Sequence, residues 1–134
     1  MKTQTVYLVE DSALVRERLL EMLDAVPGVR VAGMATRADR AIKDILAVRP
    51  DVVVLDVRLE QGSGFDVLRA LHAQAPDIDV YMLSSFASDP YRHLARQLGA
   101  RDYFDKAVDF GRVRDIVAAH VAQADNKAQA RRNA

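Results

Sequence analysis

The sequence has no cysteine, and neither sign of charge is in excess. Without cysteine the chain can form no disulfide, no thiolate nucleophile and no cysteine-ligated zinc site. Lysine and arginine together number 19, as do aspartate and glutamate, so no bulk charge attracts nucleic acid or a membrane surface. The start, MKTQTVYLVE, has only a short apolar run and indicates neither a signal peptide nor a membrane span. We therefore expect a soluble cytoplasmic protein that contacts neither nucleic acid nor a membrane.

The sequence does have a regular alternation of strand-like and helix-like segments, over a length of 134 residues that suits one domain. This alternation is typical of an α/β fold with a mainly parallel sheet. We predict a three-layer, doubly wound (βα)5 sandwich of flavodoxin-like type, with five parallel strands in the order 2-1-3-4-5. The expected strands are Thr5–Val9, Val29–Ala35, the run VVVLDVRL at 52–59, Ile78–Ser84 and Arg101–Phe104. The expected helices carry apolar stripes and lie at about 15–26, 38–46, 64–75, 89–98 and 109–121.

The last residues, AQADNKAQARRNA, contain no large apolar side chain and cannot pack against a core. We expect residues 1–122 to form the domain and residues 123–134 to be a short polar tail. The composition favours a disordered tail, and the alternative is that it extends the last helix as a frayed end.

Polar residues follow four of the five expected strands. Glu10 and Asp11 follow the first strand and Asp56 ends the third, while Ser84 and Lys106 come at the ends of the fourth and fifth. The second strand ends without such a group, as expected for a strand at the sheet edge. Because ligands bind beyond the carboxyl ends of parallel strands, near the point where the strand order reverses, we expect these side chains to converge there.

Three carboxylates in one place repel one another, by roughly 4 kcal/mol for a pair about 4 Å apart at an effective dielectric constant near 20. Either their pKa values rise or a cation lies among them, and an all-oxygen cluster suits Mg²⁺. With Lys106 as a second positive group, Asp56 fits the nucleophile of a phosphoryl transfer that forms an acyl phosphate. Taken singly, each residue also fits a plainer role, such as a cap of the first helix at Asp11 and Ser12 or a turn at Asp56.

Four short motifs occur in order at matching spacing: LVEDS at 8–12, VVVLDVRLEQGSGFDVL at 52–68, VYMLSSF at 80–86 and LGARDYFDKA at 98–107. On these motifs the sequence resembles a response-regulator receiver domain of two-component signalling, over residues 4–121. Each motif alone is a weak signal, but the ordered set is a strong one.

The resemblance implies that Asp56 accepts a phosphoryl group from a histidine kinase or a phosphotransfer protein. It also implies that Glu10, Asp11 and Asp56, together with the backbone carbonyl of Arg58, hold Mg²⁺. The chain would then be a signalling phosphoacceptor and not an enzyme, assisting only its own phosphorylation and dephosphorylation.

The same resemblance implies that Lys106 binds the phosphoryl oxygens and that the Ser84 hydroxyl moves to hydrogen-bond one of them. Tyr103 is the expected switch aromatic. The adjacent Phe104 is expected in the core, because neighbours in a strand point to opposite faces.

Two positions depart from the family pattern. Ala107 stands where receivers commonly have proline after the lysine, so the peptide bond there is cis at a cost of roughly 2.5 to 4 kcal/mol, or trans with a shifted loop. Glu60 replaces the usual proline in the loop after the phosphoacceptor, which predicts a freer loop and one more negative charge near the metal.

The leading hypothesis is a stand-alone receiver, because about a dozen residues after the last helix are too few for an output domain. Its downstream protein target would bind the face made by the helix at 89–98, the strand at 101–104 and the helix at 109–121, and the receiver would be a monomer or a weak homodimer. The alternative is a degenerate receiver-fold binding module that works without phosphorylation, favoured by Ala107 and Glu60. A small Mg²⁺ phosphatase is disfavoured, because no second acid stands two residues after Asp56.

Overall fold

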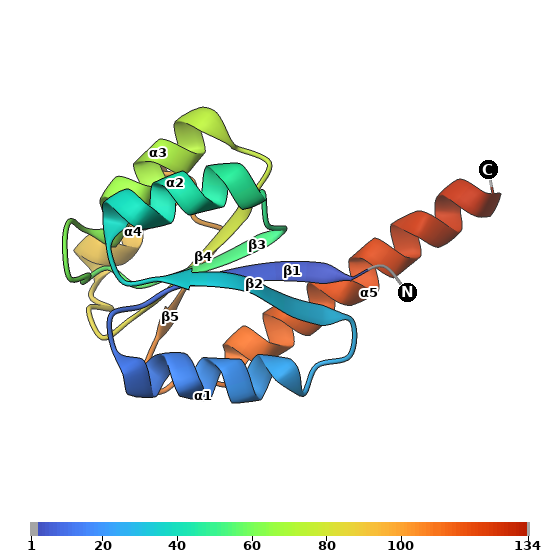
Figure 1. The fold of residues 1–134 in the computed structure, drawn as a ribbon, viewed down its shortest axis with the longest axis horizontal. Helices are drawn as coiled ribbons and strands as arrows, with labels where there is room; N and C mark the ends of the chain where they lie inside the picture. Colours follow the sequence, from blue (N-terminus) through green and yellow to red (C-terminus); the bar gives the residue numbers. More distant parts are fainter. Residues whose placement is uncertain (1–2, 134) are drawn as a thin grey trace.

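The computed structural model describes residues 3–133, and within that range it contains five strands, each followed by a helix. The strands are β1 (Gln4–Val9), β2 (Val29–Ala35), β3 (Val52–Leu55), β4 (Asp79–Ser84) and β5 (Asp102–Asp105). The helices are α1 (Ala13–Asp24), α2 (Ala38–Val48), α3 (Gly64–Gln74), α4 (Asp89–Gln97) and α5 (Arg112–Asn133). All strands run parallel in the order β2-β1-β3-β4-β5, which confirms the predicted doubly wound fold. Helices α1 and α5 cover one face of the sheet, and α2, α3 and α4 cover the other (Figure 1).

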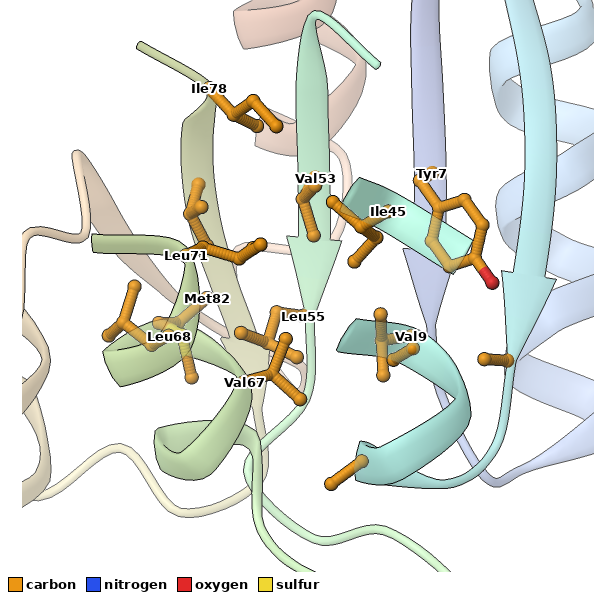
Figure 2. Close-up of a cluster of buried hydrophobic side chains, with 14 of the residues drawn as sticks. Tyr7, Val9, Ile45, Val53, Leu55, Val67, Leu68, Leu71, Ile78 and Met82 are labelled. Carbon is orange, nitrogen blue, oxygen red and sulfur yellow. The ribbon is translucent and has the colours of Figure 1, made fainter. Parts of the chain in front are cut away.

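The central strand β3 is buried on both faces. Val52 and Val54 pack in a cluster with side chains of α1 and α5, whereas Val53 and Leu55 pack in a cluster with side chains of α2 and α3 (Figure 2). This alternation follows from the period of two in a strand, and helices on both faces explain why the run is apolar throughout. The packing on both sides fixes where β3 ends, and therefore where Asp56 lies.

The third strand is shorter than the sequence predicts. β3 ends at Leu55, and the rest of the predicted stretch, through Leu59, lies in the loop before α3. The Asp56 N–H still donates to β1, but Arg58 pairs with Ser63 in an isolated antiparallel bridge that turns the chain back on itself. The predicted strand was too long because the prediction followed apolar character alone. Val57 and Leu59 are buried, but they belong to the loop and not to the sheet.

Helix α5 continues to Asn133, so the tail expected to be disordered is helical as far as the structure describes it. Beyond Val121, the last buried residue among those of α5 whose burial the structure describes, the helix projects past the sheet (Figure 1). A cavity of about 340 Å³ separates Lys127 and Arg131 from Asp51 and Asp79 at the amino end of the sheet. The domain boundary at residue 122 stays a prediction. No helix within residues 3–133 is long and apolar enough to cross a membrane.

Gly64, at the start of α3, lies so close to the backbone of Asp56 that we expect any side chain at this position to destabilise the fold. A Cβ atom on Gly64 would overlap the carbonyl oxygen of Asp56 and lie 2.8 Å from its carbonyl carbon. We expect Gly64→Ala to lower the free energy of unfolding by more than about 2 kcal/mol, because backbone must move to relieve the overlap. Denaturant unfolding measures this. The matched control is Gly111→Ala, where a Cβ meets nothing within 4 Å; equal stability of the two variants would contradict the prediction.

Candidate functional site

Polar side chains from four strands meet at the carboxyl edge of the sheet. Glu10 and Asp11 directly follow β1, Asp56 follows β3, Ser84 ends β4 and Lys106 follows β5. One carboxylate oxygen from each of Glu10, Asp11 and Asp56 lies within 4.8 Å of the other two. Glu10, Asp56 and Ser84 are buried, and Asp11 is half-buried. The structure therefore brings together the acidic residues that the strand ends predict.

The Lys106 ammonium group joins two of these carboxylates. Its Nζ donates to Glu10 Oε1 at 2.9 Å and to Asp56 Oδ2 at 2.7 Å. The other oxygen of Asp56, Oδ1, accepts the backbone N–H of Val57 at 2.7 Å. A buried charge is costly unless it is paired and hydrogen-bonded, and both oxygens of Asp56 meet that condition. This network links the ends of β1, β3 and β5.

The pKa values of the paired groups reflect this crowding. Burial, and then the nearby charge of Asp56, raise the pKa of Glu10 to about 7, although Lys106 opposes the rise. For Lys106, burial lowers the pKa, but its hydrogen bonds to Asp56 and Glu10 outweigh that effect and raise it overall. Three carboxylates against one ammonium leave the fully ionised cluster with an excess of negative charge.

The donor set of the cluster suits a hard divalent cation. The three grouped carboxylates supply only oxygen ligands, and Mg²⁺ prefers oxygen ligands and few protein groups. Asp11 is half-buried, so the cluster has access to solvent from which the remaining ligands of such an ion can come. Glu10, Asp11 and Asp56 could therefore hold a metal ion, and the excess negative charge favours one.

Residues at the start of α1 hydrogen-bond to Glu10. The Ser12 N–H donates to Glu10 Oε1 at 3.2 Å, and the Arg16 guanidinium donates to the Glu10 carbonyl at 2.9 Å. The Ser12 hydroxyl caps α1 by accepting the Val15 N–H at 3.3 Å. Of the two residues that the sequence allows as a cap, Asp11 and Ser12, the cap is Ser12, and the Asp11 carboxylate lies in the acidic cluster.

Ser84 and Tyr103 both hydrogen-bond to Phe86, the second residue of the loop between β4 and α4. The Ser84 hydroxyl accepts the Phe86 N–H at 3.1 Å, and the Tyr103 hydroxyl donates to the Phe86 carbonyl. Tyr103 is buried on the α2 and α3 side of the sheet, whereas Phe104 is fully buried on the side of α1 and α5. The predicted core position of Phe104 is confirmed. Ser84, whose hydroxyl is expected to respond to phosphorylation, and Tyr103, the expected switch aromatic, are thus linked because both hydrogen-bond to the backbone of Phe86.

Arg92 is a residue that sequence reasoning missed. From α4 its Nε donates to the Ala87 carbonyl at 2.8 Å and its NH1 group to the Tyr103 carbonyl at 2.9 Å, and its guanidinium lies 5.3 Å from the centre of the Tyr103 ring. Arg92 thereby braces the β4–α4 loop against β5. No sequence signal marks it, because the contact depends on how α4 packs against β5.

Hydrogen bonds hold the loop after Asp56, so the freer loop expected from Glu60 was wrong, while the expected extra negative charge near the metal stays a prediction. The Glu60 N–H donates to the Thr36 carbonyl at 2.9 Å, and the Glu60 carboxylate accepts the Thr36 hydroxyl at 2.8 Å. The next residue, Gln61, accepts the Ala38 N–H at 2.9 Å. These bonds tie the loop between β3 and α3 to the loop between β2 and α2. Proline at position 60 would lack the N–H that makes the first bond.

The peptide bond between Lys106 and Ala107 is trans, because none of the described residues has a cis peptide bond. This resolves the alternative that the sequence left open at Ala107.

Comparison with known proteins agrees with this geometry. The family model for the response regulator receiver domain matches residues 6–118. The DNA-binding transcriptional activator DevR/DosR of Mycobacterium tuberculosis is 37% identical over 128 residues, which cover 93% of this chain and 59% of that protein. Protein-glutamate methylesterase/protein-glutamine glutaminase 3 of Geobacter sulfurreducens is 34% identical over 106 residues, which cover 79% of this chain and 28% of that protein. The matched part is thus a fraction of the length of these longer relatives.

Solved structures show the same architecture. The response regulator domain of Thermotoga maritima CheB aligns with a TM-score of 0.80 at 26% identity, covering 93% of this chain and 98% of that one. The sequence and the fold therefore point to the same family.

The raised pKa of Glu10 predicts a pH-dependent stability in metal-free buffer. Between the ordinary value of 4.5 and about 7 the folded chain keeps a proton that the unfolded chain has lost, so stability falls as pH rises through that window. The loss is up to about 3 kcal/mol. Glu10→Gln lacks this titration. The measurement is denaturant unfolding in EDTA between pH 5 and 7.5, roughly the range that the two pKa values set. Over this range we expect the wild type to lose stability relative to Glu10→Gln.

The control for that experiment is Glu17→Gln, which changes an exposed glutamate of α1. A stability difference between wild type and Glu10→Gln that stays constant with pH would contradict the raised pKa.

Proposed function

This chain belongs to the response regulator receiver domains, and from that premise we propose that it is a phosphorylation switch whose phosphoacceptor is Asp56. The observation that carries the proposal is the buried Asp56 carboxylate, paired with Lys106 beside two further acids at the carboxyl edge of the sheet. The phosphodonor would be a histidine kinase or a phosphotransfer protein. The chain would act as a signalling phosphoacceptor that assists only its own phosphorylation and dephosphorylation.

In the proposed transfer, an oxygen of Asp56 attacks the phosphorus of a phosphohistidine. The P–N bond breaks, its electron pair stays on the imidazole nitrogen of the donor, and an acyl phosphate forms on Asp56. Lys106, whose Nζ lies 2.7 Å from Asp56 Oδ2, would turn to the phosphoryl oxygens and neutralise their charge. Glu10, Asp11 and Asp56, together with the Arg58 carbonyl that the resemblance implies, would hold Mg²⁺, which supplies further neutralisation of oxygen charge when bound.

The proposed switch runs through Ser84 and Tyr103. A serine hydroxyl can accept one hydrogen bond and donate another, so Ser84 can move to donate to a phosphoryl oxygen while Phe86 follows it. Tyr103, bonded to the Phe86 carbonyl, would rearrange with the loop. Phosphorylation would thereby shift a pre-existing equilibrium, which needs a few kcal/mol of differential stabilisation.

The proposed output is altered protein binding at the face of α4, β5 and α5. Beside this face, α4 and the loop before it expose Phe86, Tyr91 and Leu94, each at more than a third of its surface, on the side of α4 where Tyr91 stacks against Phe65 of α3. Single exposed apolar residues are ordinary, but three in adjoining segments suit a protein partner. Because charges of both signs are balanced, we propose that the receiver itself contacts proteins and neither nucleic acid nor a membrane, as a cytoplasmic monomer or weak homodimer. A stand-alone arrangement stays a prediction from the sequence.

Phosphorylation from a small donor tests the proposal. The chain is incubated with acetyl phosphate and Mg²⁺, and the product is measured by intact mass spectrometry. We expect one phosphoryl group on the wild type, none on Asp56→Asn and none in EDTA, because the acceptor or the neutralising cation is then missing.

The matched control is Asp77→Asn, which changes an exposed aspartate before β4, at the opposite end of the sheet, and should be modified like the wild type. An unmodified wild type, under conditions that modify an established receiver, would overturn the proposal and favour a binding module that works without phosphorylation.

A further inference from the structure

We infer that Asp105 is a positioning residue for Lys106: its carboxylate closes the turn after β5 and so holds the lysine where it meets Asp56. Asp105 is the last residue of β5 and directly precedes the lysine. The inference rests on the proposed function for its effect on phosphorylation, but its geometry stands on hydrogen bonds that the turn makes by itself.

Asp105 and Asp109 bracket the turn with reciprocal hydrogen bonds. The Asp105 carboxylate accepts the Ala107 N–H at 2.9 Å, and the Asp105 carbonyl accepts the Asp109 N–H at 2.8 Å. In return, the Asp109 carboxylate accepts the Asp105 N–H at 3.2 Å. The chain on both sides of Lys106 is therefore fixed by side-chain oxygens.

Backbone bonds also close this turn, because the Val108 N–H donates to the Asp105 carbonyl at 3.3 Å, but apolar packing does not hold it. The Lys106 N–H donates to the Ser84 carbonyl at 3.1 Å, which is its last bond to the sheet. Ala107 is exposed, and Val108 exposes 78% of its surface, so neither packs into the core. Where apolar packing is absent, the bond from the Ala107 N–H to the Asp105 carboxylate acts with these backbone bonds to set the direction in which the chain leaves β5. A lysine side chain is long and flexible, so the position of its backbone limits where the ammonium group can reach.

Asp105 does not act as a further ligand of the acidic cluster. Among residues 3–133 the carboxylates grouped closely enough for a cation are those of Glu10, Asp11 and Asp56. The Asp105 carboxylate instead accepts the backbone N–H of Ala107. It also needs an N–H at position 107, which alanine has and proline lacks. Asp105 and Ala107 thus form a pair, and the turn is closed without proline.

The test compares two substitutions of Asp105 with one substitution of its partner, Asp109. Asp105→Ala removes the acceptor, Asp105→Asn keeps an acceptor oxygen but removes the charge, and Asp109→Ala removes the reciprocal bond. We measure the rate of phosphorylation by acetyl phosphate well below the unfolding temperature, and Mg²⁺ affinity by calorimetry. We also measure the ¹⁵Nζ NMR signal of Lys106.

Asp105→Ala should slow phosphorylation about tenfold, as expected from a lost hydrogen bond that misplaces a catalytic group. Its Mg²⁺ affinity should stay within about twofold of the wild type, because no ligand is touched, and the Lys106 signal should shift and broaden. Asp105→Asn should restore the rate to within about threefold, since an amide oxygen also accepts. Asp109→Ala should slow phosphorylation in the same direction. Asp115→Ala, an exposed acid of α5, is the control and should match the wild type.

An Asp105→Ala variant that keeps the wild-type rate and Lys106 signal would overturn the inference. So would equal slowing by Asp105→Ala and Asp105→Asn, because the charge and not the bond would then matter. A parallel fall in Mg²⁺ affinity would overturn it too, since the whole site would then be disturbed. If the wild type itself accepts no phosphoryl group, the proposed function fails, and the Lys106 signal still decides whether Asp105 positions the lysine.

Discussion

The pairing of buried Asp56 with the Lys106 ammonium is the interaction on which the rest of the structure depends. Removing water from a carboxylate costs several kcal/mol unless a partner compensates it. Here the partner arrives from β5, across β4, and also meets Glu10 from β1. A strand that kept an unpaired charge at its end would be unstable in the centre of a sheet covered by helices. The charged residues of the site therefore allow the central strand to be buried, in addition to any chemistry that they carry out.

The fold and the acidic cluster could be predicted from the sequence, because both depend on residues that lie in or directly after the strands. The apolar run of β3 and the polar residues after four strands follow from the periods of strands and helices, and in a parallel sheet they fix both the fold and the acidic cluster. Contacts between loops could not be predicted. Glu60 was expected to free its loop, but it bonds to Thr36, and Arg92 braces Tyr103 without any motif. Such contacts depend on how two irregular segments approach each other, which no local pattern records.

The same limit applies to the helical end of the chain. Composition predicts that a polar segment without large apolar residues gains nothing from packing, and it favoured disorder beyond Val121. The segment is rich in alanine, glutamine, lysine and arginine, which have high helix propensity, and it continues a helix already nucleated by the packed residues of α5. Cooperativity from a packed neighbour decides the outcome, and a composition argument applied to the segment alone omits it.

A small tilt of α5 would be amplified along its projecting half. At 1.5 Å per residue, the helix reaches about 18 Å beyond Val121. Its inner half packs against the sheet through Val113 and Val117, while the cavity of about 340 Å³ leaves room beside the outer half. A tilt of about 10° where the helix meets the core would carry its far end through about 3 Å. A displacement too small to disturb the packed residues would thus be magnified at the tip into a change of the size of an atom.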